Sequence, residues 1–291
     1  MRFLETKRAR LRRIGRVRCV ACDLDGTLLT SDNLLSPGAL DAATEAHARG
    51  IRIVLASGRT DAFTRRYAVE LGSIAPVISL NGALAKEADG TPLASFPMPE
   101  GVAAAVDELA SPFNEADLSW SLFTTDGIIS RNEQPLLPRY LRTDADEIRR
   151  VRDLRPYYAM GLLLCAGGSY TALQRLSVML ATRFGKRLHR SLYQSGSGAD
   201  RYYLEVKRRG VSKATALRVV IDRDGIGRKE TAAIGDYSND LEMCTFAGVS
   251  AAMRNGHDDL KKAADYITRR NHNEGGVAEF LRLILEHRAP R

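Results

Sequence analysis

An apolar strand that runs directly into two carboxylates constrains this chain more than any other stretch of its sequence. Residues 19–22 are small or branched and mostly apolar, and Asp23-Leu24-Asp25-Gly26 follows at once. Residues two apart in a strand face the same side, so Asp23 and Asp25 are expected to point together before Gly26 lets the backbone turn. Two like charges held close together need a cation, or one of them must keep its proton. The pair therefore predicts a divalent-metal site, a general acid, or both.

This stretch has two simpler interpretations. Asp-Gly after a strand is a common turn signal, in which the Asp side chain bonds its own backbone. An EF-hand calcium loop also begins Asp-x-Asp, but it needs Gly at its sixth position and Glu at its twelfth. This sequence has Leu28 and Leu34 at those positions, so the calcium loop is excluded. A purely structural turn remains the alternative to a catalytic pair.

Apolar strand patterns alternate with helical patterns on both sides of a different middle region. Such alternation predicts an α/β fold with a parallel sheet and right-handed crossovers. Ligands of these sheets bind at the carboxyl ends of the strands, so Asp23, Ser57 and Asn81 should converge there. The predicted strands are 51–56, 77–80, 202–206, 231–235 and 249–252, and the predicted helices are 37–49, 61–71, 213–222, 241–246, 258–264 and 277–287.

The middle of the chain, residues 83–199, has the sequence pattern of a separate α+β unit. It carries hairpin signals at Asp89-Gly90 and Asp126-Gly127, and residues 194–198 are predicted to form a flexible connection. Strands are predicted near 118–123 and 158–164, and helices at 100–109 and 170–184. The predicted organisation is a basic N-terminal extension at 1–18, a core domain made of 19–82 and 200–291, and an inserted domain at 83–199.

The positive charge of the chain is concentrated in its first residues. The formal net charge is +8, and residues 1–18 hold eight cationic side chains against Glu5 alone, so the rest is nearly neutral. An Arg-rich arm can bind nucleic acid or acidic lipid. We interpret it instead as a solvated extension, which makes a nucleic-acid partner the less favoured alternative.

The hydropathy pattern predicts a cytoplasmic protein without a membrane span, and the cysteine spacing predicts structural cysteines. Cys19 and Cys22 form a C-x-x-C, but residues three apart in a strand face opposite sides and no second pair follows. Buried strand cysteines are therefore predicted instead of a redox or zinc site. No run of about 18 apolar residues occurs, and the basic arm lacks the apolar segment of a secretory signal.

Further polar residues follow other predicted strands or begin predicted helices. Each has a structural alternative: Ser57 could cap a turn, Lys213 could be solvated, and acids near a helix start are favoured by the helix dipole. Their shared position at one sheet edge favours a common site. The set comprises Asp23, Asp25, Ser57, Lys213, Asp236, Asn239 and Asp240.

This set resembles the haloacid dehalogenase-like hydrolase superfamily, in particular its Cof-type phosphatases with a class IIB cap. The resemblance runs from about Cys19 to Glu286. It departs in small ways at Ala214, where Gly is frequent, and at Glu274-Gly275-Gly276, where Asp-Gly is usual. It rests on Asp23-Leu24-Asp25-Gly26-Thr27-Leu28-Leu29, Ala56-Ser57-Gly58-Arg59, Asn81-Gly82-Ala83, Gly210-Val211-Ser212-Lys213 and Gly235-Asp236-Tyr237-Ser238-Asn239-Asp240.

The resemblance implies a fold and a division of roles. The fold would be a Rossmann-like three-layer core with an inserted α+β cap at 83–199. Asp23 would be the nucleophile that forms an aspartyl-phosphate, and Asp25 the general acid and base. Mg²⁺ would be held by Asp23, the backbone carbonyl of Asp25 and Asp236, with Asp240 supporting the site. The phosphoryl group would be bound by Ser57, Gly58 and Lys213 and oriented by Asn239.

The expected function is a Mg²⁺-dependent phosphatase that hydrolyses small phosphorylated metabolites. The alternatives are a phosphomutase of similar fold, a nucleic-acid-binding protein that uses the arm, and a pseudoenzyme, against which the intact acidic set argues. No motif between residues 83 and 199 identifies the substrate, so sugar phosphates, nucleotides, flavin mononucleotide and pyridoxal phosphate all stay open. The oligomeric state is not readable from the sequence.

Overall fold

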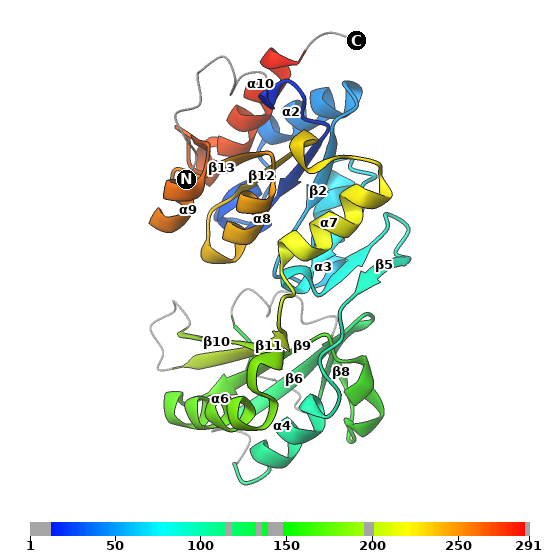
Figure 1. Ribbon diagram of the computed structural model, residues 1–291, viewed down its shortest axis with the longest axis vertical. Coiled ribbons are helices and arrows are strands. Elements are labelled where there is room, and N and C mark those ends of the chain that lie inside the picture. Colours follow the sequence, from blue (N-terminus) through cyan, green and yellow to red (C-terminus); the bar gives the residue numbers. More distant parts are fainter. Residues whose placement is uncertain (1–12, 114–117, 132–135, 139–147, 195–200, 289–291) are drawn as a thin grey trace. The chain divides into compact units, whose positions relative to one another are not determined.

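The computed structural model describes residues 13–113, 118–131, 136–138, 148–194 and 201–288 (Figure 1). The chain forms two compact units. The first contains the described residues up to Gly58, Phe63–Ala94, and the described residues from Ser212 onward. The second contains Arg59–Ala62 and the described residues within Ser95–Val211.

A five-stranded parallel sheet with the order β14-β13-β12-β1-β2 forms the centre of the first unit. An isolated parallel bridge from Ala56 to Ile78 joins it to the three-stranded sheet β3-β4-β5. The predicted parallel α/β core is thereby confirmed. The strands are β1 Cys19–Cys22, β2 Arg52–Leu55, β3 Val77–Ser79, β4 Leu84–Lys86, β5 Pro92–Ser95, β12 Thr231–Gly235, β13 Val249–Ala252 and β14 Tyr266–Ile267.

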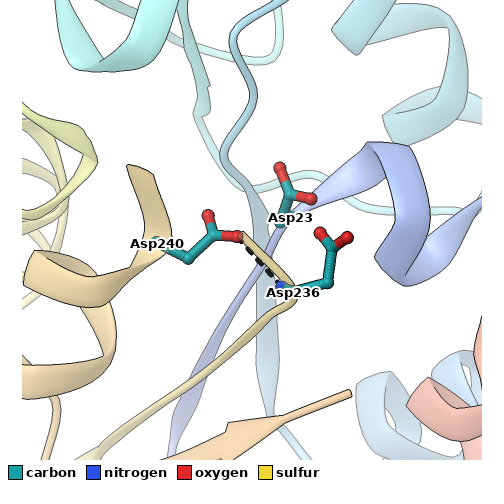
Figure 2. A group of neighbouring side chains, drawn as sticks. All are labelled: Asp23, Asp236 and Asp240. Carbon is teal, nitrogen blue, oxygen red and sulfur yellow. Dashed lines mark hydrogen bonds between the residues drawn. The ribbon is translucent and has the colours of Figure 1, made fainter. Parts of the chain in front are cut away.

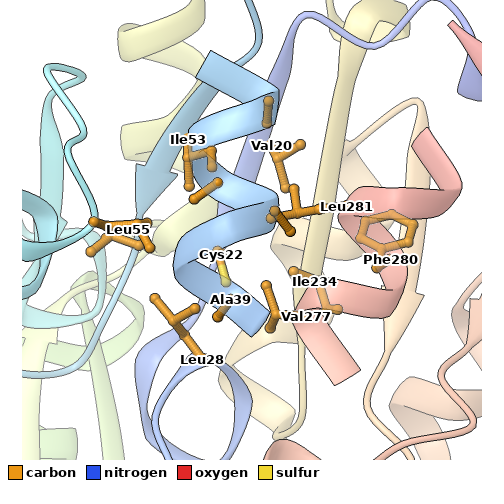
Figure 3. Packing of buried hydrophobic residues seen from close by; sticks show 14 of the residues in the cluster. Val20, Cys22, Leu28, Ala39, Ile53, Leu55, Ile234, Val277, Phe280 and Leu281 are labelled. Atoms are coloured by element: carbon orange, nitrogen blue, oxygen red, sulfur yellow. The ribbon is translucent and has the colours of Figure 1, made fainter. Parts of the chain in front are cut away.

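Helices lie on both faces of this sheet, which gives three layers (Figure 1). Helices α2 and α10 pack against one strand face in a single buried cluster, which includes Val20, Ile53 and Ile234 (Figure 3). The alternate strand residues are also buried, as expected when a parallel sheet is covered on both sides. The helices are α2 Pro37–Ala48, α3 Asp61–Glu70, α7 Lys213–Arg223, α8 Leu241–Phe246, α9 Asp258–Ala263 and α10 Gly276–His287.

The sequences of α2 and α10 explain their packing. The apolar residues of α10 recur at positions 277, 280, 281 and 284, which places them on one helix face. The buried residues of α2 are all alanines, so its backbone can lie close to the sheet. Ser36 caps α2 by accepting a bond from the Ala39 amide at 3.2 Å, and Pro37 begins the helix.

The inner end of the N-terminal arm packs against the first unit. Ile14 and Val17 are buried in the same cluster as α2 and α10. Arg13 forms an ion pair with Asp265 at 3.1 Å, and Arg18 approaches Glu230 at 3.4 Å. The arm residues that precede Arg13 lie outside the described part of the chain.

The second unit is a six-stranded sheet with the order β10-β11-β9-β6-β7-β8, covered on one face by α4 Val102–Ala110 and α6 Tyr170–Phe184. Its strands pair antiparallel, except for the parallel pair β7 and β8. This is the α+β architecture predicted for the inserted region. The strands are β6 Leu118–Thr124, β7 Gly127–Ser130, β8 Ile148–Arg150, β9 Leu163–Gly168, β10 Leu188–Gln194 and β11 Tyr202–Arg208.

Two strands of this unit differ from the sequence-based prediction. The strand predicted at 158–164 is β9 at Leu163–Gly168, because Arg155–Met160 forms a helical turn that Pro156 favours at its start. Strand β10, which alternates polar and apolar residues along Leu188–Gln194, was not predicted. Both predicted hairpins are present, with Asp89-Gly90 between β4 and β5 and Asp126-Gly127 between β6 and β7.

Four further sequence-based expectations concern the domain boundaries, the connection at 194–198, the cysteines and membrane spans. The two units divide at Ala94–Ser95 and at Val211–Ser212, whereas the sequence-based boundaries lie at 82–83 and 199–200. The connection predicted at 194–198 falls mostly outside the described residues. All four cysteines are buried and free, as was predicted for Cys19 and Cys22. No helix in the described part of the chain is long and apolar enough to cross a membrane.

Candidate active site

Parallel strand pairing brings two of the predicted carboxylates together. Cys22, the last residue of β1, pairs with Ile234 of β12, and the Asp23 amide donates to the Ile234 carbonyl at 3.1 Å. Asp236 directly follows β12, so Asp23 and Asp236 leave neighbouring strands at the same sheet edge. Asp240 joins them from the turn before α8 (Figure 2). One carboxylate oxygen from each of the three lies within 4.8 Å of the others.

The turn after β1 lies against Asp236. Asp25 has φ −74° and ψ 121°, and Gly26 has φ 76° and ψ 0°, which are the dihedral angles of a type II turn. A Cβ added to Gly26 would lie 2.3 Å from Asp236 Oδ2, so both the turn and the close approach require glycine. Thr27 Oγ1 also donates to Asp236 Oδ1 at 3.1 Å. The Asp25 carboxylate is not part of the group of three, and its role stays a prediction.

Lys213 is the buried cation of this cluster. Its Nζ donates to Asp23 Oδ1 at 2.5 Å and to Asp240 Oδ1 at 2.6 Å, and the side chain is fully buried. Ser212 caps α7 by accepting from the Thr215 amide, which places Lys213 at the first position of the helix. Burial opposes the charged form of Lys213, but the two carboxylates outweigh it and hold the lysine pKa above its ordinary value.

Asp240 anchors the cluster. Its Oδ2 accepts bonds from the amides of Asp236 at 3.0 Å and of Tyr237 at 3.1 Å, the first of which is drawn in Figure 2. Its Oδ1 accepts from Lys213, and the residue is fully buried. Because both oxygens already have protein donors, Asp240 is placed to hold Lys213 and the Asp236 backbone in position.

The electrostatics of the cluster favour a further cation. Burial, and then the negative charge of Asp240, raise the pKa of Asp23 well above its ordinary value. The same two causes raise the pKa of Asp236 to about 6, although the Thr27 bond opposes the shift. Three buried or half-buried carboxylates face one ammonium group here. A divalent cation would relieve this excess of negative charge, and carboxylate oxygen is the donor that Mg²⁺ prefers.

The raised pKa of Asp236 predicts how the metal-free protein responds to pH. An Asp236 pKa of about 6, against an ordinary value of 3.8, means that the folded state binds more protons within this window. The contribution of Asp236 to the free energy of unfolding therefore falls as pH rises from about 4 to above 6. Asp236→Asn should stabilise the chelator-treated protein more at pH 7 than at pH 5, as measured by urea unfolding. An equal effect at the two pH values would show that Asp236 titrates normally.

A second group gathers the predicted phosphate-binding residues around Asn81. Asn239 Nδ2 donates to Asn81 Oδ1 at 3.0 Å, and the Asn81 amide donates to the Ser57 carbonyl at 3.0 Å. A Cβ on Gly58 would lie 3.1 Å from Asn81 Oδ1, so the backbone there runs against this side chain. Ser57 is fully buried. The structure thus links Ser57, Gly58 and Asn239 to one another through Asn81.

Asn81 was expected to converge with Asp23 and Ser57 but was given no role, and Thr27 and Asn255 were not singled out as site residues. The position of Asn81 directly after β3 indicates a place in the site, because Asp23 and Ser57 lie at the same sheet edge. Thr27 lies two positions after Asp25, and its bond to Asp236 spans 209 residues. Asn255 follows β13 at the same edge and donates to the Gly26 carbonyl at 2.8 Å. A polar residue after a strand end was the available signal for Asn81 and Asn255.

Gly82 controls how closely the Asn81 turn approaches the start of α7. Its φ is +88°, and an added Cβ would lie 2.0 Å from the Ser212 carbonyl oxygen and 2.7 Å from the Lys213 amide. We expect Gly82→Ala to lower the free energy of unfolding by about 3–5 kcal/mol, from the clash and the positive φ together. The matched control is Gly72→Ala, since Gly72 has φ +69° with nothing within 4 Å, and should cost about 1–2 kcal/mol. Urea unfolding measures both free energies. Equal losses would show that the close approach of Ser212 adds nothing to the cost of a side chain at position 82.

Known proteins resemble this chain over nearly its whole length. Residues 20–281 match the family model of the haloacid dehalogenase-like hydrolases. A 5-amino-6-(5-phospho-D-ribitylamino)uracil phosphatase, YwtE of Bacillus subtilis, is 27% identical, with 92% of this chain and 98% of the relative covered.

Solved structures of similar fold also cover most of this chain. A haloacid dehalogenase-like hydrolase from Bacteroides thetaiotaomicron is 29% identical with a TM-score of 0.77, and the match covers 92% of this chain and 99% of that one. The protein TM0651 of Thermotoga maritima has the same TM-score at 27% identity, with 91% and 97% covered.

Proposed function

We propose, from the premise that this chain belongs to the haloacid dehalogenase-like hydrolase family and is a Cof-type phosphatase, that it is a Mg²⁺-dependent enzyme acting on small phosphorylated metabolites. The observation that carries the proposal is the cluster of Asp23, Asp236 and Asp240 around a buried Lys213. It lies within the matched region and at the sheet edge where ligands of α/β proteins bind.

The donor set suits a hard divalent cation. The carboxylates of Asp23 and Asp236 and the backbone carbonyl of Asp25 would hold Mg²⁺, and Asp240 would fix the Asp236 backbone behind them. All of these donors are oxygens, and the excess of negative charge around Lys213 supports a cation there. When bound, Mg²⁺ would neutralise charge on the phosphoryl group that is transferred.

The side chains of the site fit a two-step hydrolysis. In the first step an Asp23 oxygen bonds to phosphorus while the bond from phosphorus to the ester oxygen breaks, and Asp25 gives that oxygen its proton. In the second step water attacks the aspartyl-phosphate and Asp25 takes a proton from the water. Inorganic phosphate then leaves, and the Asp23 carboxylate is restored.

Lys213 and the Asn81 group would stabilise the transferring phosphoryl group. The Lys213 ammonium, 2.5 Å from Asp23 Oδ1, favours the ionised carboxylate that can attack. It can also donate hydrogen bonds to phosphoryl oxygens as their charge develops. Ser57, Gly58 and Asn239 would bind and orient the other oxygens. The hydrogen bonds of Asn239 and of the Ser57 backbone to Asn81 support this role because they limit the movement of both residues.

The experiment for this proposal is phosphate release from a panel of esters. The panel includes sugar phosphates, nucleotides, flavin mononucleotide, pyridoxal phosphate and 5-amino-6-(5-phospho-D-ribitylamino)uracil, the substrate in the names of two relatives. Release should stop in excess chelator and return with Mg²⁺, while Ca²⁺ should support it poorly because its looser coordination misplaces the reacting groups. Full turnover in excess chelator would contradict the proposal.

The same assay separates the alternative functions. A phosphomutase would return the phosphate to another hydroxyl of the product, so little free phosphate would appear. A nucleic-acid-binding protein would show binding that weakens steeply with salt and is lost without the arm. The arm cations Arg13 and Arg18 already contact Asp265 and Glu230, which favours a structural role for this inner end.

A further inference from the structure

Asn255 forms a hydrogen-bonded link between two loops beside the acidic cluster. Its Nδ2 donates to the Gly26 carbonyl at 2.8 Å, and its Oδ1 accepts from the His272 amide at 3.1 Å. Gly26 belongs to the turn that carries Asp25 and lies against Asp236. The asparagine therefore uses both ends of its amide to hold this turn to the chain around residue 272.

The loop that carries Asn255 is also fixed to the Asp236 segment. The Met253 amide donates to the Gly235 carbonyl at 2.9 Å, and the His257 amide donates to the Asp236 carbonyl at 2.7 Å. Residues 253–257 thus bind the backbone of Gly235 and Asp236 directly and reach the Asp25–Gly26 turn through the Asn255 side chain. This side chain thus adds a second link between the two predicted metal-binding segments, beside the direct bond from Thr27 to Asp236.

We propose that Asn255 is a positioning residue that sets the spacing between the Asp23–Asp25 segment and Asp236, and thereby the affinity for the divalent cation. The inference rests on the proposed function, because it assumes that these segments hold Mg²⁺. Mg²⁺ tolerates little departure from its preferred octahedral geometry, so a small shift of one segment weakens binding. Residues that orient metal ligands typically change metal affinity about 10–100-fold when removed.

The exposure of Asn255 makes a positioning role distinguishable from a structural one. The residue is exposed, so water can replace its bonds to Gly26 and His272 when it is truncated. The fold should then lose little stability, while the turn gains freedom to move. A change in metal affinity without a matching change in unfolding is the result that a merely structural asparagine would not give.

The first test compares Asn255→Ala with Asn273→Ala by calorimetric titration of Mg²⁺ into the full-length protein without substrate. Asn273 is also an exposed asparagine in the same region, and its side chain bonds the amide and hydroxyl of Ser31 at 2.8 and 3.0 Å instead of Gly26. Asn255→Ala should weaken Mg²⁺ binding about tenfold or more, and Asn273→Ala less than about twofold. Urea unfolding in chelator should give similar midpoints for both.

The second test removes the other bond of Asn255 without changing Asn255. His272 is the first residue of a short helical turn after Asn271, whose φ of −83° and ψ of −177° suit a residue before proline. His272→Pro deletes the amide that donates to Asn255 Oδ1, whereas His272→Ala deletes only the ring, which contacts Ser31 Oγ at 3.1 Å. His272→Pro should weaken Mg²⁺ binding severalfold, and His272→Ala should not.

The results separate this inference from the proposed function. Unchanged Mg²⁺ affinity in folded Asn255→Ala, equal losses in the two asparagine variants, or a wild-type protein that binds no Mg²⁺ would each overturn it. Absence of phosphate release from every ester would count against the proposed function alone, because the titration contains no substrate. A loss of affinity in Asn255→Ala and His272→Pro together supports the positioning role.

Discussion

Asp23→Asn should abolish phosphate release, with a loss of about 10⁴-fold or more, as expected when a covalent nucleophile is removed. An amide is a poor nucleophile and a weaker metal ligand than a carboxylate. Asn keeps the size of Asp, and its carbonyl oxygen can still accept from Lys213, so the variant should fold. No phosphorylated protein should be detected by mass spectrometry after acid quenching. Near-normal turnover by Asp23→Asn would overturn the assignment of the nucleophile.

Asp25→Asn is the matched comparison, because it removes proton transfer while keeping the backbone carbonyl predicted to bind Mg²⁺. Both chemical steps should slow by about 10²–10⁴-fold. An aryl phosphate leaves as a stable anion and needs little protonation, so its first step should suffer less than that of an alkyl phosphate. Hydrolysis of the intermediate still needs a base, so phosphate should accumulate on the peptide that contains Asp23. Phosphate on another peptide would contradict these roles.

The site residues that could be predicted from the sequence are those whose positions follow from local sequence patterns. A buried strand, a glycine turn and strand–helix alternation are local patterns, and parallel pairing then places the strand ends at one edge. Asp23 and Asp236 came together for this reason, and Lys213 joined them because Ser212 begins α7 beside that edge. Asn239 and Asp240 follow β12 in the same way.

The parts that sequence reasoning missed depend on contacts between distant residues. The bond from Asn255 to Gly26 spans 229 residues, and neither residue has a local pattern that indicates the other. In the second unit, β10 lies at the sheet edge, paired with β11 alone, so it is half-exposed and lacks the apolar run of a buried strand. The position of β9 was missed because its pairing with β6 and β11 decides which residues of an apolar stretch form the strand.

Lys213→Met should be the most destabilising single substitution in the acidic cluster. Lys213 donates to both Asp23 and Asp240, and no other cation contacts these two carboxylates among the described residues. Removing one partner of a buried ion pair leaves uncompensated charge, which typically costs about 3–5 kcal/mol in the free energy of unfolding. The matched control is Lys262→Met on α9, because Lys262 is 75% exposed and pairs with Asp259 at 3.4 Å. Its loss should be below about 1 kcal/mol.

The cost of Lys213→Met should depend on pH and on Mg²⁺ in defined directions. The pKa of Asp23 is raised by burial and by Asp240 even beside the ammonium, and removing Lys213 should raise it further. At lower pH the carboxyls of Asp23 and Asp236, whose pKa values are raised, take up protons, so less negative charge stays uncompensated and the variant should recover stability relative to wild type. Added Mg²⁺ should also stabilise the variant, since it supplies positive charge to the same carboxylates. Urea unfolding at pH 5 and pH 7, with and without Mg²⁺, measures all three effects. If Lys213→Met costs no more than Lys262→Met under every condition, the carboxylates do not depend on the buried lysine, and the charge balance inferred for this site is wrong.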